Sequence, residues 1–159
     1  MNDELHQKFM QRAIELSRDN VTRCNGGPFG AVIVKDGHVI GEGWNQVTAS
    51  NDPTAHAEVE AIRNACTNLQ VFDLSGADIY TSCEPCPMCL AAIYWARLRT
   101  IYYCNTKEDA ASIEFDDDFI YKEFAKEPSH RAIPMQRIHN HEGMQVFAQW
   151  KAQDGRIRY

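Results

Sequence analysis

The order of predicted elements places this chain of 159 residues in the α/β class. Helix and strand patterns alternate along it, a tight hairpin joins two antiparallel strands, and a strand-helix-strand unit adds a parallel pair. A sheet that contains both kinds of pair is mixed. We therefore predict a single domain over residues 1–159, built as a three-layer α-β-α sandwich around a mixed five-stranded sheet.

The first predicted helix carries an apolar stripe. Four apolar residues recur at spacings of four and three: Leu5, Phe9, Ala13 and Leu16. They share one face of a helix, which we expect to be buried. Gly26-Gly27-Pro28 then interrupts the chain before a buried strand at 31–34. Asp36-Gly37 is a strong signal for a two-residue turn, so the strand His38 to Trp44 should return antiparallel beside the first.

The middle of the chain predicts a strand-helix-strand unit that follows another helix. Asp52-Pro53 suits a helix start, because aspartate is a favoured N-cap and proline a favoured first helical residue. This helix should run through about Thr67. A strand at 77–81, a helix from Pro87 to about Ala96 and a strand at 100–104 then form the parallel pair.

The last third predicts a helix near 116–124, a fifth strand near Met135 to His139, and a helix near 143–153.

Composition limits the classes of function. The net charge is -6, from 16 Lys plus Arg against 22 Asp plus Glu, so nucleic acid is not expected as a partner. No apolar run approaches the roughly 20 residues of a membrane span, and the charged N-terminal residues exclude a signal peptide. We expect a cytoplasmic protein in which the six cysteines serve as metal ligands or free thiols.

Two motifs contain metal-ligating residues. His56-Ala57-Glu58 is followed, 27 residues after Glu58, by Pro85-Cys86-Pro87-Met88-Cys89. One imidazole and two thiolates suit zinc, and three protein ligands leave a fourth position for water. Zinc lowers the pKa of such a water to about 7, which makes it a nucleophile at neutral pH. The spacing therefore predicts hydrolysis at a zinc ion held by His56, Cys86 and Cys89.

Both motifs fall at expected helix starts, where the partial positive charge favours thiolates. Glu58 is the expected proton carrier. When water adds to an amidine-like ring carbon, the neighbouring nitrogen must gain a proton and the departing nitrogen must leave as ammonia, and one carboxylate can move both protons. With Cys83 as a fourth ligand, the same residues would form a closed structural site. We prefer the catalytic interpretation, because a closed site gives Glu58 no role.

These motifs resemble the family of zinc-dependent deaminases that includes cytidine, cytosine, tRNA adenosine and guanine deaminases. The likeness is closest to bacterial guanine deaminases and extends over almost the whole chain. It covers the segments 26–37, 48–58, 80–89 and 115–123, together with the C-terminal Tyr159. The resemblance implies a cytidine deaminase-like fold, one zinc ion per subunit and guanine as the small-molecule substrate.

The resemblance also implies roles for individual residues. Asn45 would contact a purine edge and Phe29 would pack on the base. Asp117 would act at the exocyclic amine, and Tyr159 would close the pocket. In this family the C-terminal segment is exchanged between subunits, so a domain-swapped homodimer is implied in which Tyr159 serves the partner's active site.

Each of these residues also has an ordinary structural explanation. Asn45 suits a turn and Phe29 a core. Tyr159 suits a frayed end. Trp95, on the helix after Cys89, would either stack on the substrate or only pack. The three aspartates at 116–118 suit a solvated helix start, and the sequence leaves open which one faces the site.

The predicted reaction is hydrolytic deamination of guanine at C2 to xanthine and ammonia, with Glu58 and Asp117 as the catalytic residues. A tRNA adenosine deaminase is an alternative that calls for clustered Lys and Arg. Another nucleobase or a triazine amine is an alternative substrate. A structural zinc module for protein interaction is the non-enzymatic alternative.

Overall fold

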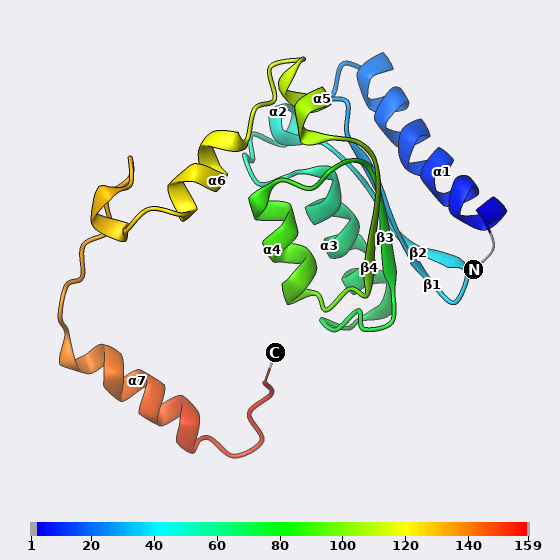
Figure 1. Ribbon diagram of the computed structural model, residues 1–159. Helices are drawn as coiled ribbons and strands as arrows, with labels where there is room; N and C mark the ends of the chain where they lie inside the picture. Colours follow the sequence, from blue (N-terminus) through cyan, green and yellow to red (C-terminus); the bar gives the residue numbers. More distant parts are fainter. Residues whose placement is uncertain (1–2, 159) are drawn as a thin grey trace. The chain divides into compact units, whose positions relative to one another are not determined.

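The computed structural model describes residues 3–158, and Tyr159 lies outside them. The chain divides into two compact units, Met1–Asp117 and Asp118–Tyr159. The first unit contains the sheet and the second consists of helical segments joined by extended chain (Figure 1). That all 159 residues form one domain stays a prediction.

The first unit is a mixed sheet of four strands in the order β2-β1-β3-β4. β1 is antiparallel to both β2 and β3, whereas β3 is parallel to β4. The α/β class, the mixed sheet and the parallel pair are confirmed. The strands have these bounds: β1 Gly30–Lys35, β2 His38–Trp44, β3 Asp78–Cys83 and β4 Thr100–Asn105.

The prediction of a fifth strand is wrong for the described chain. Residues 135–139 belong to the second unit and are extended, but they form no ladder with a described strand. An apolar pattern such as that of Met135 and Ile138 is not sufficient for a strand, because a strand also needs a neighbouring backbone with which to exchange hydrogen bonds.

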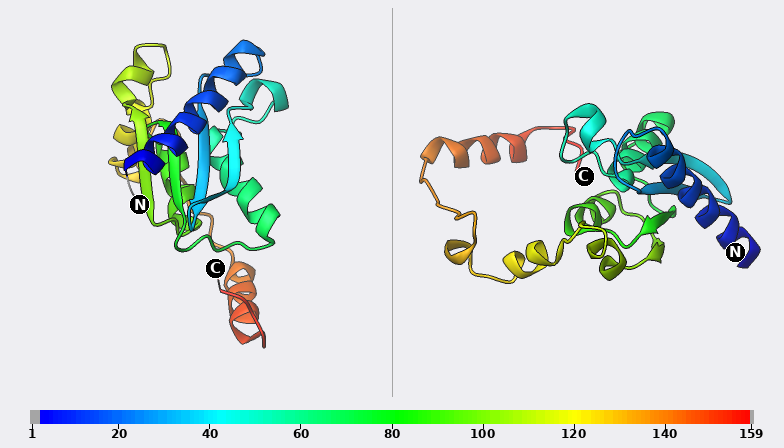
Figure 2. Two further views of the ribbon diagram at one scale, coloured as in Figure 1. Left: turned by 90° about the vertical axis from the view of Figure 1, so that its right-hand side faces the viewer. Right: turned by 90° about the horizontal axis from the view of Figure 1, so that it is seen from above.

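Helices cover both faces of the sheet and complete the three layers. The helices of the first unit are α1 Asp3–Thr22, α2 Val47–Ser50, α3 Ala57–Leu69, α4 Pro87–Trp95 and α5 Lys107–Ala111. The left view of Figure 2 shows α1 lying across one face, while α3 and α4 cover the other. One core cluster, with Phe9 and Tyr80, lies under α1. A second, with Ala61 and Ile79, lies under α3 and α4.

The predicted hairpin is confirmed, because Asp36 and Gly37 connect β1 to β2. Both residues have positive φ angles, 51° and 78°. Two successive residues with positive φ define the turn type whose twist matches that of the two strands.

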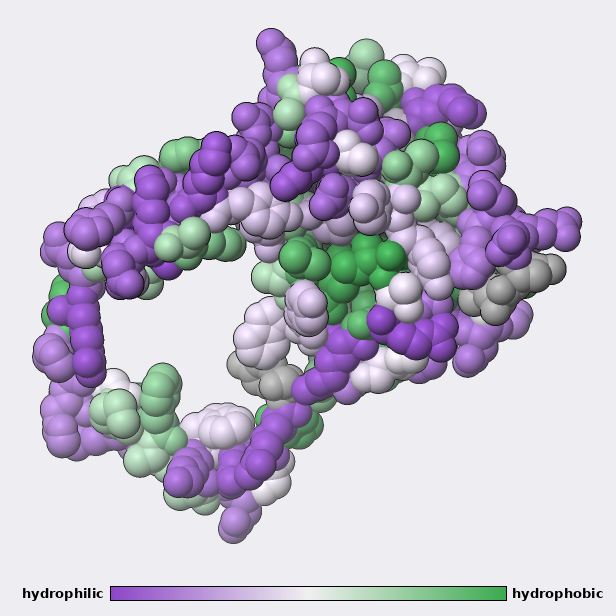
Figure 3. Space-filling model, viewed as in Figure 1, coloured by the Kyte–Doolittle hydropathy of each residue, from purple (hydrophilic) through white to green (hydrophobic). Residues whose placement is uncertain are grey.

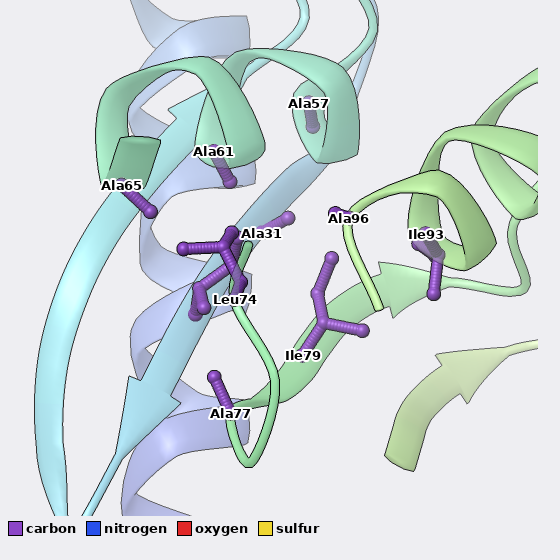
Figure 4. Packing of buried hydrophobic residues seen from close by; sticks show 10 residues of the cluster. Ala31, Ala57, Ala61, Ala65, Leu74, Ala77, Ile79, Ile93 and Ala96 are labelled. Carbon is purple, nitrogen blue, oxygen red and sulfur yellow. The ribbon is translucent and has the colours of Figure 1, made fainter. Parts of the chain in front are cut away.

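Small residues let α3 lie directly on β2. Figure 4 shows the alanines of α3 facing Leu74 and Ile79 across the core. A Cβ atom added at Gly43 would lie 2.2 Å from the carbonyl oxygen of Ala57 and 2.4 Å from the nitrogen of Ala61. The backbone of the helix therefore rests on the backbone of the strand, which fixes the start of α3 relative to the sheet.

The start of α3 differs from the prediction. The helix begins at Ala57 with His56 as its N-cap. The Asp52 carboxylate accepts hydrogen bonds from the Thr54 N–H at 2.8 Å and the Thr54 hydroxyl at 2.7 Å. Aspartate often closes such a local turn, and this turn competes with helix capping.

The second unit has almost no core of its own. It contains α6 Asp118–Phe124, the 3₁₀ helix η1 Pro128–His130 and α7 His141–Ala152. Between 118 and 158, Glu123 alone is buried, while Ile133 and Ile138 are 84% and 89% exposed. Within residues 3–158, no helix combines the length and the apolar character that crossing a bilayer demands.

Candidate functional site

The three predicted metal ligands lie together where two helices begin. His56 is the N-cap of α3 and Cys86 is the N-cap of α4, with Cys89 in the first turn of α4. The His56 Nδ1 atom lies 3.6 Å from Cys86 Sγ and 3.5 Å from Cys89 Sγ. Both helix starts therefore contribute to one group of potential metal ligands.

The donor set and its spacing fit zinc. Zinc bonds of about 2.3 Å to sulfur and about 2.0 Å to nitrogen, at tetrahedral angles, separate the nitrogen and sulfur ligands by about 3.6 Å. The ligand atoms here all lie within 4.8 Å of one another, and the two nitrogen-to-sulfur distances match that value. Three ligands of this kind would hold zinc with one position left for water.

The two thiols influence each other strongly. The hydrogen bond with Cys89 lowers the pKa of Cys86 to about 4, and His56 contributes to the same shift. The interaction with Cys86, together with burial, raises the pKa of Cys89. In the absence of a cation, Cys86 therefore loses its proton readily, whereas Cys89 keeps its own. A bound cation is what allows both sulfurs to be thiolates at the same time.

Cys83 is not a fourth ligand. Its thiol is buried on β3 and donates to the Thr106 carbonyl at 3.6 Å. Burial, with a smaller contribution from Glu58, raises its pKa to about 11, so it resists becoming a thiolate. Among residues 3–158, His56, Cys86 and Cys89 form the one group placed to hold a metal ion. The closed four-ligand site is thus not what the described chain forms.

Glu58 lies beside this group in the second position of α3. It is 6% exposed, and burial raises the pKa of its carboxyl. One carboxyl oxygen, Oε1, accepts a hydrogen bond from the Thr81 hydroxyl at 3.2 Å. The other, Oε2, lies 3.3 Å from Cys89 Sγ. The carboxyl group therefore adjoins the metal ligands and is positioned to exchange protons beside them.

Asn45 directly follows β2, and its buried side chain contacts the loop that precedes β1. Its Oδ1 atom accepts the backbone N–H groups of Gly27 at 3.2 Å and Val47 at 3.3 Å. Asn20 donates from Nδ2 to the carbonyls of Gly27 and Asn45, both at 2.9 Å. Because the Asn45 oxygen is engaged by backbone, its amino group is the part of the side chain suited to donate to a ligand.

Phe29 packs against the core cluster under α3 and α4, and its contact with a base and the role of Asp117 stay predictions. Phe29 is half-buried, and its ring meets Phe115 edge to face, with ring centres 4.9 Å apart. Burial and then the charge of Cys86 raise the pKa of Asp117, so that carboxyl lies within electrostatic reach of the metal ligands. Its neighbour Asp118 forms an ion pair with Lys122. Asp117 is thus the member of the acidic run best supported as a site residue.

The described residues place neither of two predicted substrate contacts at the site. Trp95 is the last residue of α4, at the opposite end from Cys86, and it is 69% exposed. Tyr159 lies outside the described residues. Both assignments stay predictions.

Two residues that support the site were not identified from the sequence. Thr81 carries a hydroxyl in a fully buried strand, and Asn20 carries an amide near the end of the helix with the apolar stripe. A polar residue in an otherwise apolar element is the available signal, since a buried polar group needs a partner. The identity of that partner becomes known only with the tertiary structure.

Comparison with known proteins agrees with this geometry. The family model for the cytidine and deoxycytidylate deaminase zinc-binding region matches residues 3–105. Guanine deaminase of Bacillus subtilis is 53% identical over 146 residues, which is 92% of this chain and 94% of that protein. Its X-ray structure superimposes with a TM-score of 0.94 at 50% identity, covering 100% of this chain and 99% of the other.

More distant relatives include enzymes that act on tRNA. A tRNA-specific adenosine deaminase of Haemophilus influenzae is 39% identical over 124 residues, which is 75% of this chain and 71% of that protein. A guanine deaminase structure from Nitrosomonas europaea has a TM-score of 0.65 at 33% identity, covering 69% of this chain and 63% of the other.

Proposed function

This chain belongs to the family of cytidine and deoxycytidylate deaminases that share a zinc-binding region, and on that premise we propose that it is a zinc-dependent guanine deaminase. It hydrolyses guanine at C2 to xanthine and ammonia. The observation that carries this conclusion is the open three-ligand group beside a buried Glu58, in a chain 53% identical to a guanine deaminase over 92% of its length.

The reaction needs a nucleophile and two proton transfers. When bound, zinc supplies the nucleophile by lowering the pKa of a coordinated water. Glu58 would take one proton from the attacking water and deliver it to the ring nitrogen next to C2, as the water oxygen bonds to C2. Glu58 would then carry the second proton from that oxygen to the exocyclic nitrogen. The bond from C2 to that nitrogen breaks, ammonia leaves, and the oxygen becomes the C2 carbonyl of xanthine.

The burial of Glu58 suits this work. A carboxyl that must both accept and release a proton near neutral pH works best when its pKa lies above the usual value. Burial raises the pKa of Glu58 in that direction.

Other site residues orient the base. Asn45 donates from its amino group to an acceptor on the purine edge, because its oxygen already accepts from Gly27 and Val47. Phe29 packs against the face of the base. Asp117 holds the exocyclic amine or assists proton delivery to it, which its electrostatic interaction with Cys86 supports.

Charge argues against a tRNA substrate. The net charge of -6 opposes the approach of a phosphate backbone, and the match to the tRNA-specific enzyme covers 75% of the chain against 92% for guanine deaminase. A cytoplasmic location stays a prediction from the sequence.

Exposed apolar surface supports a homodimer. α4 contains no charged residue, yet Tyr94 and Trp95 are 76% and 69% exposed. Figure 3 shows apolar surface in the part of the first unit where α4 lies. A helix that is apolar on all sides is normally buried, so a second copy is the expected cover.

We propose further that the C-terminal segment is exchanged between the two subunits. From 118 to 158 this segment buries Glu123 alone, which is too little to hold it in place. β4 ends the order of described strands, so its outer edge is a place for the extended residues 135–139 of the partner. Tyr159 then closes the active site of the other subunit.

The function is tested by measuring ammonia release from zinc-loaded protein. The panel comprises guanine, adenine, cytosine, cytidine, guanosine and a triazine amine. We expect guanine to be preferred, and a Glu58→Ala variant to retain zinc while losing at least about a hundredfold in kcat. Exclusive turnover of cytidine, or full activity in the variant, would contradict the proposal.

A further inference from the structure

The Thr81 hydroxyl lies in the otherwise apolar layer between the sheet and α3. Successive side chains of a strand point to opposite faces. On β3, Tyr80 packs in the cluster under α1 and Ile79 in the cluster under α3. Thr81 therefore shares the face of Ile79, and it is 1% exposed. A hydroxyl in this position needs a hydrogen-bond partner, and its partner is Glu58 Oε1 at 3.2 Å.

The two oxygens of Glu58 are consequently not equivalent. Oε1 faces the sheet and accepts from Thr81, whereas Oε2 lies 3.3 Å from Cys89 Sγ on the side of the metal ligands. The terminal torsion of a glutamate is broad, so a carboxyl without a fixed partner rotates easily. A hydrogen bond to one oxygen defines the direction of the other.

We propose that Thr81 is a positioning residue of the deamination. It holds Oε1 of Glu58 so that Oε2 is the oxygen that accepts and delivers both protons. This inference rests on the proposed function and extends it to a residue that acts through Glu58.

The donor and the acceptor are each held by rigid structure. Thr81 lies in the centre of the sheet, paired with Ala31 of β1 and Tyr103 of β4. Its branched β-carbon restricts the rotation that would move the hydroxyl. Glu58 is fixed by α3, whose backbone rests on Gly43. The hydrogen bond thus fixes the orientation of the Glu58 carboxyl group relative to the sheet.

The test compares two variants of matched shape. Thr81→Val keeps the branched shape and removes the hydroxyl, whereas Thr81→Ser keeps the hydroxyl and removes a methyl group. For guanine, we expect Thr81→Val to lower kcat by about 10-fold to 100-fold, with KM within about twofold and one zinc per subunit. Thr81→Ser should stay within about threefold of the unmodified protein in kcat.

A double variant separates positioning from packing. If Thr81 acts through Glu58, Thr81→Val should cost nothing further in kcat when added to Glu58→Ala. An unchanged kcat in Thr81→Val, or equal losses in Thr81→Val and Thr81→Ser, would overturn the inference. So would a full additional loss in the double variant.

Two further comparisons keep the outcome decisive. If Thr81→Val does not fold, Thr81→Ser and Thr81→Ala differ by the hydroxyl alone, and equal kcat values in that pair would overturn the inference. If the unmodified protein releases no ammonia from guanine, the proposed function itself fails. An active protein with an insensitive Thr81 would refute the positioning role and leave the function standing.

Discussion

At the scale of single residues, Asn20 connects the loop before β1 to the residue that follows β2. Its amino group donates to the carbonyls of Gly27 and Asn45, while its own Oδ1 is buried without a hydrogen-bond partner among the described residues. A buried acceptor left unpaired costs free energy. The two hydrogen bonds from the Asn20 amino group to the carbonyls of Gly27 and Asn45 offset this cost.

We therefore expect Asn20→Ala to lower the free energy of unfolding by about 2 kcal/mol and to raise KM for guanine, because the loop carrying Asn45 loses its restraint. Asn68→Ala is a matched control, since exposed Asn68 also donates to a carbonyl, that of Ile40 at 3.1 Å. Denaturant unfolding and steady-state kinetics measure both effects. Equal losses in the two variants would show that the burial of Asn20 is irrelevant.

Tyr80 provides a prediction about pH. Burial, followed by the nearby Tyr102 and Asp78, raises its pKa from 10.0 to about 12, and its hydroxyl lies 2.8 Å from His6 Nδ1. A raised pKa means that the folded state favours the neutral phenol. Its contribution to stability is therefore complete below pH 10 and is lost as the pH rises toward 12.

An absorbance titration of tyrosinate, with circular dichroism recorded in parallel, checks this prediction. The folded protein should show a late component near pH 12 that disappears in Tyr80→Phe. If Tyr80→Phe keeps the late component, Tyr80 is not its source.

At the scale of elements, the contact between α3 and β2 decides where His56 and Glu58 lie. Gly43→Ala places a Cβ atom in steric clash with the backbone of α3, and the clash is relieved only if the helix moves. We expect the free energy of unfolding to fall by about 3 kcal/mol, with weaker zinc binding, because the start of the helix is displaced.

Gly143→Ala is the matched control for this substitution. It lies in α7, where an added Cβ meets no atom of residues 3–158 within 4 Å. Alanine favours helix over glycine, so this variant should be neutral or more stable by up to about 1 kcal/mol. Denaturant unfolding and zinc titration of both variants measure the difference, and similar behaviour would show that close backbone approach does not matter here.

The sequence predicted elements well where a local signal decides the outcome. Asp36-Gly37 defined the hairpin, and Pro87 marked the start of α4. It failed where the outcome depends on distant partners. Asp52 makes a local turn in place of a cap, and residues 135–139 lack a neighbouring strand within the described chain. The metal ligands were predictable because zinc chemistry restricts both residue type and spacing, whereas Thr81 and Asn20 depend on contacts that no local pattern encodes.

At the scale of the whole molecule, the proposed exchange of the C-terminal segment predicts complementation between two variants. Glu58→Ala and Tyr159→Ala should each be strongly impaired alone. In a mixed dimer, one of the two active sites combines the unmodified Glu58 of one chain with the unmodified Tyr159 of the other. If the subunits pair at random, about half of the dimers are mixed, so co-expression should restore up to about one quarter of the activity. Separately purified variants mixed without subunit exchange are the control. A co-expressed pair that stays inactive would rule out exchange.

The metal ligands and Glu58 all belong to the first unit, Met1–Asp117. We therefore expect zinc binding not to depend on where the second unit, Asp118–Tyr159, packs. We expect in turn that a newly made chain binds zinc before it forms the proposed homodimer. Monomeric and dimeric populations should accordingly contain equal amounts of metal per chain and differ only in turnover.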